Sequence, residues 1–378
     1  MGKLMQDDER SQHVPFNDLV IQWRLVADDV RRDMEALFSQ SAYSQGPFAA
    51  AFERQIAEWM GVRHAIGVNS GTSALHLAMI AADLGPGDEV LVPTHTFIGT
   101  IWGILYVGAT PVLCDVDEAT GTLDLADAAR RVTPRTKAIL PVHLYGQPAD
   151  MGAVQALAEK HGLTVIEDAA QAIGARRGGQ MVGTIGSMGC VSFYPGKNLG
   201  AAGEAGLIVT NNDAQADRLR ALRNHGQRER YVHHEMGFNY RMDGIQAIVL
   251  SHKLRHLDSW TNQRKDLAAR YAEALSDLPL ELPRVVNDDH VWHLYVVRTP
   301  ARDALRAHLQ SKNVETGLHY PVPLHQQPCL AGYPKAALGF PQAERWAEQG
   351  LSLPLFVGMT LAQQDYAIAA IREFFAHG

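Results

Sequence analysis

The sequence predicts an α/β fold in which a mostly parallel sheet is covered by helices on both faces, with a smaller α+β domain at the C-terminus. Up to about residue 255, short apolar runs alternate with helical stretches, as they do when helices connect parallel strands. The short runs are apolar almost without interruption, which is typical of strands buried on both faces. At 378 residues the chain is also long enough for a large core and a second domain.

The expected elements follow this alternation along the chain. We expect strands of the large domain at residues 65–68, 89–93, 111–116, 138–142, 163–167, 190–193 and 207–210. We expect helices between them at residues 74–81, 98–107, 149–161 and 213–223. The chain then leaves this domain through helical residues 242–260 and 262–278, and the smaller domain contains strands at 292–298 and 318–321. We therefore assign an N-terminal arm and the large domain to residues 1–255, and the smaller domain to residues 256–378.

Composition and charge exclude several classes of protein. Hydrophobic residues make up 46% and charged residues 20% of the chain, which are ordinary values for a globular protein. A net charge of −7 and a pI near 6.2 argue against binding nucleic acid through a basic face. No apolar run is long enough to span a membrane, and Met1–Val14 lacks the apolar core of a signal peptide. We expect neither a nucleic-acid nor a membrane partner.

Cysteine and histidine usage points to a cytoplasmic protein without a metal site. The three cysteines, Cys114, Cys190 and Cys329, are far apart and odd in number, which fits reduced cytoplasmic thiols. Seventeen histidines include the adjacent pair His233 and His234. Neighbouring histidines rarely face one ion, so we expect no bound metal.

Two segments carry a lysine and a carboxylate at the ends of apolar runs. Lys197 lies in a glycine-rich turn after the run 188–193, and Asp168 follows the run 163–166. A lysine that can form a Schiff base, paired with a buried carboxylate, is what a pyridoxal phosphate (PLP) site requires. The carboxylate would keep the pyridine nitrogen protonated so that the ring accepts electrons. Taken alone, each segment also fits a surface lysine or a helix-capping aspartate.

A third segment could bind the phosphate of such a cofactor. The expected strand 65–68 is followed by Gly71, Thr72 and Ser73 and then by the expected helix 74–81. A junction of this kind directs free backbone N–H groups and the positive end of the helix at an anion, and the two hydroxyls could add hydrogen bonds. Competing phosphate motifs fail: Gly196-Lys197 is followed by Asn198, and the glycines at 183, 186 and 189 have the wrong spacing for a dinucleotide turn.

Together these segments resemble the DegT/StrS-type sugar aminotransferases, which are fold-type I PLP-dependent transferases acting on nucleotide-linked keto-sugars. The resemblance covers nearly the whole chain. Besides the segments of Asp168 and Lys197, it rests on Val14-Pro-Phe-Asn-Asp-Leu19, Gln45-Gly-Pro47, Phe52-Glu53, Asn69-Ser-Gly-Thr-Ser-Ala-Leu75, Val92-Pro-Thr-His-Thr-Phe97, Gly108-Ala-Thr-Pro-Val112, residues 140–151, Gly237-Phe-Asn-Tyr-Arg-Met-Asp243, His319-Tyr-Pro-Val-Pro-Leu-His325 and Leu351-Ser-Leu-Pro-Leu355.

The resemblance implies roles for individual residues in binding the cofactor. Lys197 would hold PLP as the internal aldimine and move a proton between substrate and cofactor, and Asp168 would pair with the ring nitrogen. Dehydratases of this family carry histidine in place of that lysine, so Lys197 favours amino transfer. The other implied cofactor contacts are Gln171 near O3′, Phe97 on the ring face, Ser192 on the phosphate, and Asn239 on the phosphate of the neighbouring subunit, which makes the protein an obligatory homodimer.

The resemblance also implies the substrate and its contacts. Tyr194, His319 and Tyr320 would face the sugar, while Arg228 and Arg230 could bind the diphosphate across the subunit interface. We expect amino transfer from an amino acid, glutamate, to C3 of a dTDP-linked 3-keto-6-deoxyhexose. Amination at C4 is the alternative within the family. A PLP-bound lyase or regulator is the alternative outside it.

Overall fold

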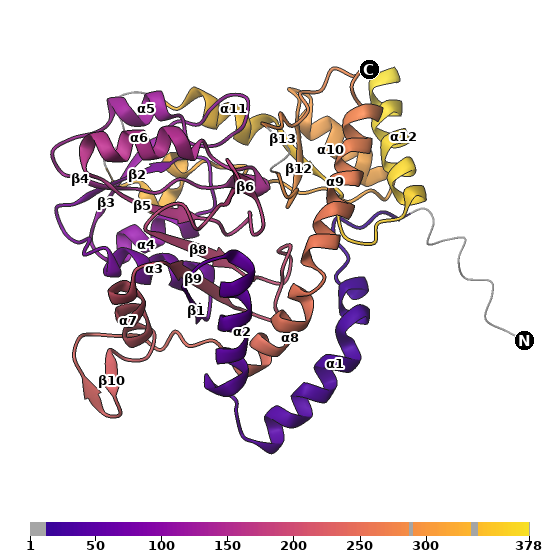
Figure 1. The fold of residues 1–378 in the computed structure, drawn as a ribbon. Coiled ribbons are helices and arrows are strands. Elements are labelled where there is room, and N and C mark those ends of the chain that lie inside the picture. The colour runs from indigo at the N-terminus through magenta and orange to yellow at the C-terminus, as the bar shows by residue number, and fades with distance from the viewer. Residues whose placement is uncertain (1–12, 287–289, 334–338, 378) are drawn as a thin grey trace, which may run out of the picture.

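The computed structural model describes residues 13–286, 290–333 and 339–377. Our interpretation of the first 14 residues therefore falls mostly on residues 1–12, outside the described part. The long helix α9 (Leu257–Ala274) connects a large sheet to a smaller C-terminal core (Figure 1).

Within the described residues, seven strands form the central sheet in the order β1-β9-β8-β5-β4-β2-β3. All neighbouring pairs are parallel except those of β9, which runs antiparallel to β1 and β8. This confirms the mostly parallel sheet. The strands are β1 (His64–Val68), β2 (Glu89–Pro93), β3 (Thr110–Cys114), β4 (Thr136–Ile139), β5 (Thr164–Asp168), β8 (Met188–Ser192) and β9 (Gly206–Thr210).

Helices cover both faces of the sheet because its strands send successive side chains to opposite faces. Val90 and Val92 pack against one group of helices, α3 (Gly71–Ala81), α4 (Gly99–Tyr106) and α7 (Asp213–Leu222). Leu91 packs on the other face, where α5 (Leu125–Arg130) and α6 (Met151–His161) lie. Leu207 and Val209 of β9 also reach this opposite face, against α2 (Gly46–Met60) and α8 (Gly244–Leu254).

The C-terminal part has a hydrophobic core of its own. Strands β12 (Tyr295–Arg298) and β13 (Gly350–Leu353) pair antiparallel and pack with α9, α10 (Arg302–Ser311) and α12 (Leu361–His377). Val14 is buried in the same core, and its backbone N–H donates to the carbonyl of Asn313 over 3.0 Å. The part of the N-terminal arm around Val14 thus belongs to the C-terminal core. We propose that the domain boundary lies between residues 255 and 256, in the break between α8 and α9.

The remaining elements are short or peripheral. Helix α1 (Val20–Ser39) packs along α8. The others are β6 (Arg176–Arg177), β7 (Gln180–Met181), β10 (Gln227–Glu229), β11 (Val232–His233), α11 (Pro341–Gln349) and the 3₁₀ turns Leu144–Gly146, Leu324–Gln326 and Pro328–Leu330. No helix in the described part of the chain is long and apolar enough to cross a membrane.

Two sequence expectations were wrong. Residues 242–260 are not one helix, because α8 ends at Leu254 and α9 begins at Leu257, and no Gly or Pro marks the break. Residues 318–321 do not form a strand. Pro321 and Pro323 have no N–H to offer a ladder, so only the neighbouring Gly317 bridges to β13, at Ser352.

Candidate active site

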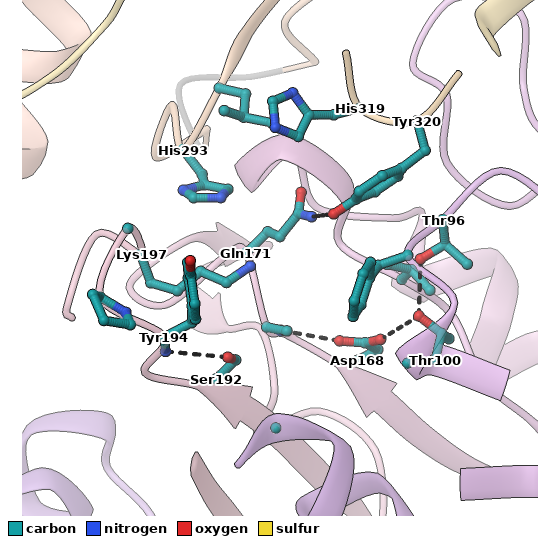
Figure 2. A pocket seen from close by; sticks show the side chains of 18 of the residues that line it. Thr96, Thr100, Asp168, Gln171, Ser192, Tyr194, Lys197, His293, His319 and Tyr320 are labelled. Atoms are coloured by element: carbon teal, nitrogen blue, oxygen red, sulfur yellow. Dashed lines mark hydrogen bonds between the residues drawn. The ribbon is translucent and has the colours of Figure 1, made fainter. Parts of the chain in front are cut away.

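A cavity of about 830 Å³ lies between the carboxyl ends of the sheet strands and the C-terminal part. It is lined from the sheet side by Asp168 at the end of β5, by Ser192 at the end of β8 and by Phe97 after β2. His293 and the segment around His319 line it from the C-terminal side (Figure 2). Open α/β sheets place their ligands at these strand ends, so the cavity is the candidate active site.

Lys197 lies in this cavity, in the turn that follows β8. Its backbone N–H donates to the carbonyl of Tyr194 over 2.9 Å, which fixes the turn. Its side chain extends toward the centre of the cavity (Figure 2). Burial lowers the pKa of the lysine amine to about 8, although the nearby Asp168 carboxylate acts in the opposite direction. About a fifth of the amine is therefore neutral and nucleophilic at pH 7.4.

Asp168 is a buried carboxylate, 4% exposed, that forms no ion pair with a described residue, although the Lys197 amine lies near enough to interact with it electrostatically. Thr100 Oγ1 donates to its Oδ2 over 2.8 Å, and the N–H of Ala170 donates to its Oδ1 over 3.1 Å. Burial raises the pKa of this carboxyl, and the two hydrogen bonds only partly oppose that effect. A protonated ring nitrogen beside Asp168 would supply the missing positive charge.

A second buried carboxylate, Glu167, directly precedes Asp168 in β5. Glu167 accepts a hydrogen bond from His143 Nε2 over 2.9 Å and backbone N–H groups from Gly183, Ile185 and Gly186. Burial alone would raise the pKa of Glu167, but these donors lower it overall. The network holds the end of β5, and hence Asp168, in place.

The N-terminus of α3 points into the same cavity. Ser70 caps the helix by accepting the N–H of Ser73 over 3.0 Å, and its hydroxyl donates to Ser73 Oγ over 2.9 Å. Gly71 and Thr72 line the cavity, whereas Ser73 is buried in the cap and does not. A Cβ at Gly71 would lie 2.7 Å from Ser192 Cβ, so only glycine lets the helix end approach β8 this closely.

Aromatic and amide groups join the sheet side of the cavity to its C-terminal side. Phe97 is 51% exposed and tilts against Tyr320 with ring centroids 5.6 Å apart. Gln171 Nε2 donates to Tyr320 Oη over 3.0 Å, and its Oε1 accepts the N–H of Tyr145 over 2.7 Å. Gln171 is thus held at a fixed orientation between the sheet and the C-terminal part.

Tyr194 and His319 also line the cavity. His319 hydrogen-bonds through Nδ1 to Ser352 Oγ over 2.8 Å and stacks on Phe16 at 5.6 Å. Burial lowers the pKa of His319 to about 4, and Lys197 adds to the effect, so the imidazole is neutral at physiological pH.

Besides Ser73, three of the residues singled out from the sequence lie outside the cavity of this single chain. Asn239 is exposed and bridges to Asn224. Arg228 and Arg230 are exposed on the β10–β11 hairpin, which projects from the body of the molecule (Figure 1). Arg230 lies over the ring of Tyr231, 5.0 Å from its centroid.

Several lining residues were missed by the sequence reasoning. Ser70 could have been found, because a serine before an expected helix is a typical N-cap. Thr100 and His293 carry no local signal, since their importance comes from contacts between distant segments. The lining residues not singled out as site residues are Phe16, Asn17, Leu19, Ser70, Leu75, Thr96, Gly99, Thr100, Val142, Ala170, Pro195, Gly196, Glu204, Arg264, His293, Leu294, Leu353 and Leu355.

Comparison with known proteins identifies the family. The model of the DegT/DnrJ/EryC1/StrS aminotransferase family matches residues 26–372. The chain belongs to this family. The dTDP-3-amino-3,4,6-trideoxy-alpha-D-glucose transaminase of Streptomyces venezuelae is 44% identical over 372 residues, covering 98% of this chain and 98% of the relative. The crystal structure of S. venezuelae DesV in complex with a ketimine intermediate matches with a TM-score of 0.93 at 45% identity, over 96% of this chain and 98% of that one.

The protein is an aminotransferase with PLP as its cofactor. NtdA from Bacillus subtilis, solved with bound cofactor PMP, matches with a TM-score of 0.89 at 31% identity, over 97% of this chain and 86% of that one. The residues of the cavity fit this cofactor. Asp168 is a buried carboxyl that makes no ion pair with a described residue, and Gly71 brings a helix N-terminus against Ser192.

Proposed function

We propose that the protein transfers an amino group from glutamate to C3 of a dTDP-linked 3-keto-6-deoxyhexose. The observation that carries this proposal is that Lys197 and the buried carboxylate of Asp168 face one cavity beside a helix N-terminus. The similarity to a C3-aminating dTDP-sugar transaminase over almost the full length of both chains supports the sugar substrate and the position.

Lys197 and Asp168 are assigned the chemical roles. The cofactor supplies an aldehyde that captures amines and a ring that accepts electrons. Lys197 anchors it and, once released, moves a proton at the substrate carbon. A pKa of about 8 suits that task, because the amine can both accept and return a proton near neutral pH. Asp168, positioned by Thr100, keeps the ring nitrogen protonated.

The other lining residues are assigned to binding and orientation. Gly71, Thr72 and Ser192 would bind the phosphate, with Ser73 contributing through the helix cap. Phe97 would stack on the ring and Gln171 would hydrogen-bond near O3′. Tyr194, His319 and Tyr320 would face the sugar; their rings line the outer and C-terminal walls of the cavity.

We infer that the working protein is a homodimer with shared active sites. Asn239 would reach the partner's phosphate, and Arg228 and Arg230 would contact the diphosphate in the partner's site. The exposure of large apolar side chains near Asn239 supports this inference, since Tyr231 is 76% and Met236 85% exposed in the single chain. We also infer a cytoplasmic location, which the free, buried thiols of Cys114 and Cys190 support.

The decisive experiment has two steps. Purified PLP-loaded protein is first mixed with glutamate alone, and the visible absorption band should shift to that of the amine form. The amine form is then mixed with 3-keto and 4-keto sugars carrying dTDP or UDP, and the products are assigned by NMR. Transfer to a 4-keto sugar in place of a 3-keto sugar would establish the alternative position. Failure of any amino acid to convert the band to that of the amine form would instead favour a lyase or a regulator.

A further inference from the structure

Tyr145 is buried next to the active-site cavity without lining it. It lies in the 3₁₀ turn Leu144–Gly146, which comes after β4, and is 4% exposed. Each of its three polar groups bonds to a residue that does line the cavity. Its N–H donates to Gln171 Oε1 over 2.7 Å, its carbonyl accepts the N–H of Leu294 over 3.2 Å, and its hydroxyl donates to the carbonyl of His319. One buried residue thus holds three parts of the cavity wall.

The hydroxyl of Tyr145 is the middle of a chain of hydrogen bonds that has one direction. A carbonyl oxygen can only accept, so the phenol proton is directed at His319. His95 Nε2 lies 2.7 Å from the same phenol oxygen and must therefore donate to it. Burial lowers the pKa of His95 to about 3, with Arg298 adding to the effect, and raises the pKa of Tyr145 well above its ordinary value. At physiological pH the imidazole is thus neutral and the phenol keeps its proton.

The backbone of Tyr145 is in the left-handed region, with φ at 60° and ψ at 4°. A bulky residue seldom adopts this conformation, whereas glycine takes it without steric cost. By backbone preference tyrosine is a poor residue for this turn, so its side chain has to offset that cost. The side chain does so through the hydroxyl and through its ring, which packs against His95 and Trp346 with centroids 6.2 and 6.0 Å away.

The contacts of Tyr145 reach Tyr320 by two routes. On the first, the N–H of Tyr145 orients the amide of Gln171, whose Nε2 donates to Tyr320 Oη over 3.0 Å (Figure 2). On the second, the hydroxyl of Tyr145 holds the carbonyl of His319, the residue directly before Tyr320. Tyr320 is therefore fixed through its own hydroxyl and through the residue that precedes it.

We propose that Tyr145 is a positioning residue for the keto-sugar and acts by fixing His319 and Tyr320. This rests on the proposed function, in which the side chains of those two residues face the sugar. The hydroxyl of Tyr145 serves the sugar side through His319, whereas its backbone N–H serves Gln171, which is assigned to the cofactor. A substitution that removes only the hydroxyl separates the two tasks, because the backbone N–H stays.

Tyr145→Phe tests this proposal in the PLP-loaded protein. KM for the keto-sugar nucleotide should rise by about tenfold, because a hydrogen bond that fixes the sugar contacts is lost. The value of kcat and the half-reaction with glutamate should stay within about twofold of wild type, and the PLP absorbance should be unchanged. In a Tyr320→Phe background, the same substitution should raise KM by less than about threefold, because the contact that it positions is already missing.

Tyr271 offers a matched control. It is also a buried tyrosine outside the cavity lining, and its hydroxyl donates to a backbone carbonyl, that of Pro354, over 3.0 Å. Tyr271→Phe should lower the melting temperature to a similar extent as Tyr145→Phe, since each variant loses one buried hydrogen bond. KM for the keto-sugar nucleotide should nevertheless stay at the wild-type value in Tyr271→Phe.

Equal losses in both half-reactions would show that Tyr145 only supports the fold, and an unchanged KM for the sugar would also overturn the proposal. So would full additivity of Tyr145→Phe and Tyr320→Phe. If Tyr145→Phe does not fold, His95→Phe replaces it, because it removes the donor to the phenol oxygen. That variant should raise KM for the sugar by about threefold without slowing the glutamate half-reaction, and an unchanged KM would count against the proposal.

A crystal structure of Tyr145→Phe gives a readout that needs no substrate. His319 and Tyr320 should be displaced or less ordered than in the wild type, while Gln171 stays in place. Unmoved positions of His319 and Tyr320 would refute the proposal. A wild-type protein that aminates no keto-sugar nucleotide refutes the proposed function itself, and the crystal structure then still decides whether Tyr145 positions these two residues.

Discussion

The two walls of the active-site cavity are built in different ways. On the sheet side, Asp168, Ser192 and the turn of Lys197 each follow a buried strand, so the sheet fixes their backbone. On the C-terminal side, Arg264, His293 and His319 come from a helix and two irregular segments, and hydrogen bonds between those segments hold them. The sheet side carries the groups assigned to the cofactor and also Tyr194, whereas His319 and Tyr320, which are assigned to the sugar, lie on the C-terminal side. The difference suggests that chemistry and specificity can change separately.

Removing the lysine should give the largest effect. Lys197→Ala should abolish turnover with every substrate while the melting temperature changes little, because a lysine in a turn contributes little to stability. Absorbance spectra and both half-reactions measure this. Lys137→Ala, which removes an exposed lysine from β4, is the control and should be active. Wild-type-like activity in Lys197→Ala would falsify the assignment of the sheet wall.

Replacing the buried carboxylate of Asp168 should have the second-largest effect on activity. Asp168→Asn should slow both half-reactions by about 100-fold or more, because an amide cannot stabilise a protonated ring nitrogen as an anion does. The amide oxygen can still accept from Thr100, so folding should be kept. Rapid-mixing absorbance with glutamate and PLP titration of the apoprotein are the measurements. Unchanged rates would remove Asp168 from the chemistry.

A change in the C-terminal wall should affect one substrate only. His319→Asn should raise KM for the keto-sugar nucleotide by about tenfold, through the loss of one polar contact, and leave the glutamate half-reaction near wild type. Steady-state kinetics with each substrate varied will separate the two effects. His161→Asn, at the exposed end of α6, is the control. If both half-reactions suffer equally, the two walls are not functionally separate.

Lys197 should also give the loading of the apoprotein a characteristic pH dependence. The neutral amine reacts with the PLP aldehyde, and burial lowers its pKa to about 8. The loading rate should therefore rise by about fivefold between pH 7 and pH 8, by about twofold from pH 8 to pH 9, and level off above pH 9. The rate at which a lysine analogue in solution reacts with PLP should keep rising toward pH 10. A loading rate that follows the analogue would mean that burial does not tune Lys197.

The smallest expected effect is the activity recovered on mixing two inactive variants, which tests whether a second copy of the chain completes the cavity. Asn239→Ala and Lys197→Ala should each be nearly inactive, but after dissociation and mixing, one of the two sites in a mixed dimer carries neither change. About half of random dimers are mixed, so activity should approach about a quarter of the wild-type level. Native mass spectrometry verifies the exchange. Verified exchange without recovery would mean that Asn239 serves its own chain.

The same contrast between the walls explains what the sequence could predict. The strand β2 was predicted residue for residue, and Asp168 and Lys197 were found because strand ends and glycine-rich turns leave local patterns. Thr100, Arg264 and His293 were not found, because each acts through residues far away in the chain. The strand expected at 318–321 failed for a related reason, since apolar character alone does not give Pro321 and Pro323 the N–H groups that a ladder needs.

Val14 packs in the C-terminal core, directly before a segment that lines the active-site cavity. Phe16, Asn17 and Leu19 line the cavity just after this anchor, and Phe16 donates its N–H to Glu315 Oε2 over 2.9 Å. This stretch of the cavity wall is therefore held by hydrogen bonds to the C-terminal part, whereas helix α1, which follows it, packs along α8. A cut between residues 255 and 256 would leave the first fragment carrying a piece of the other fragment's interior, so neither half could form a complete site alone.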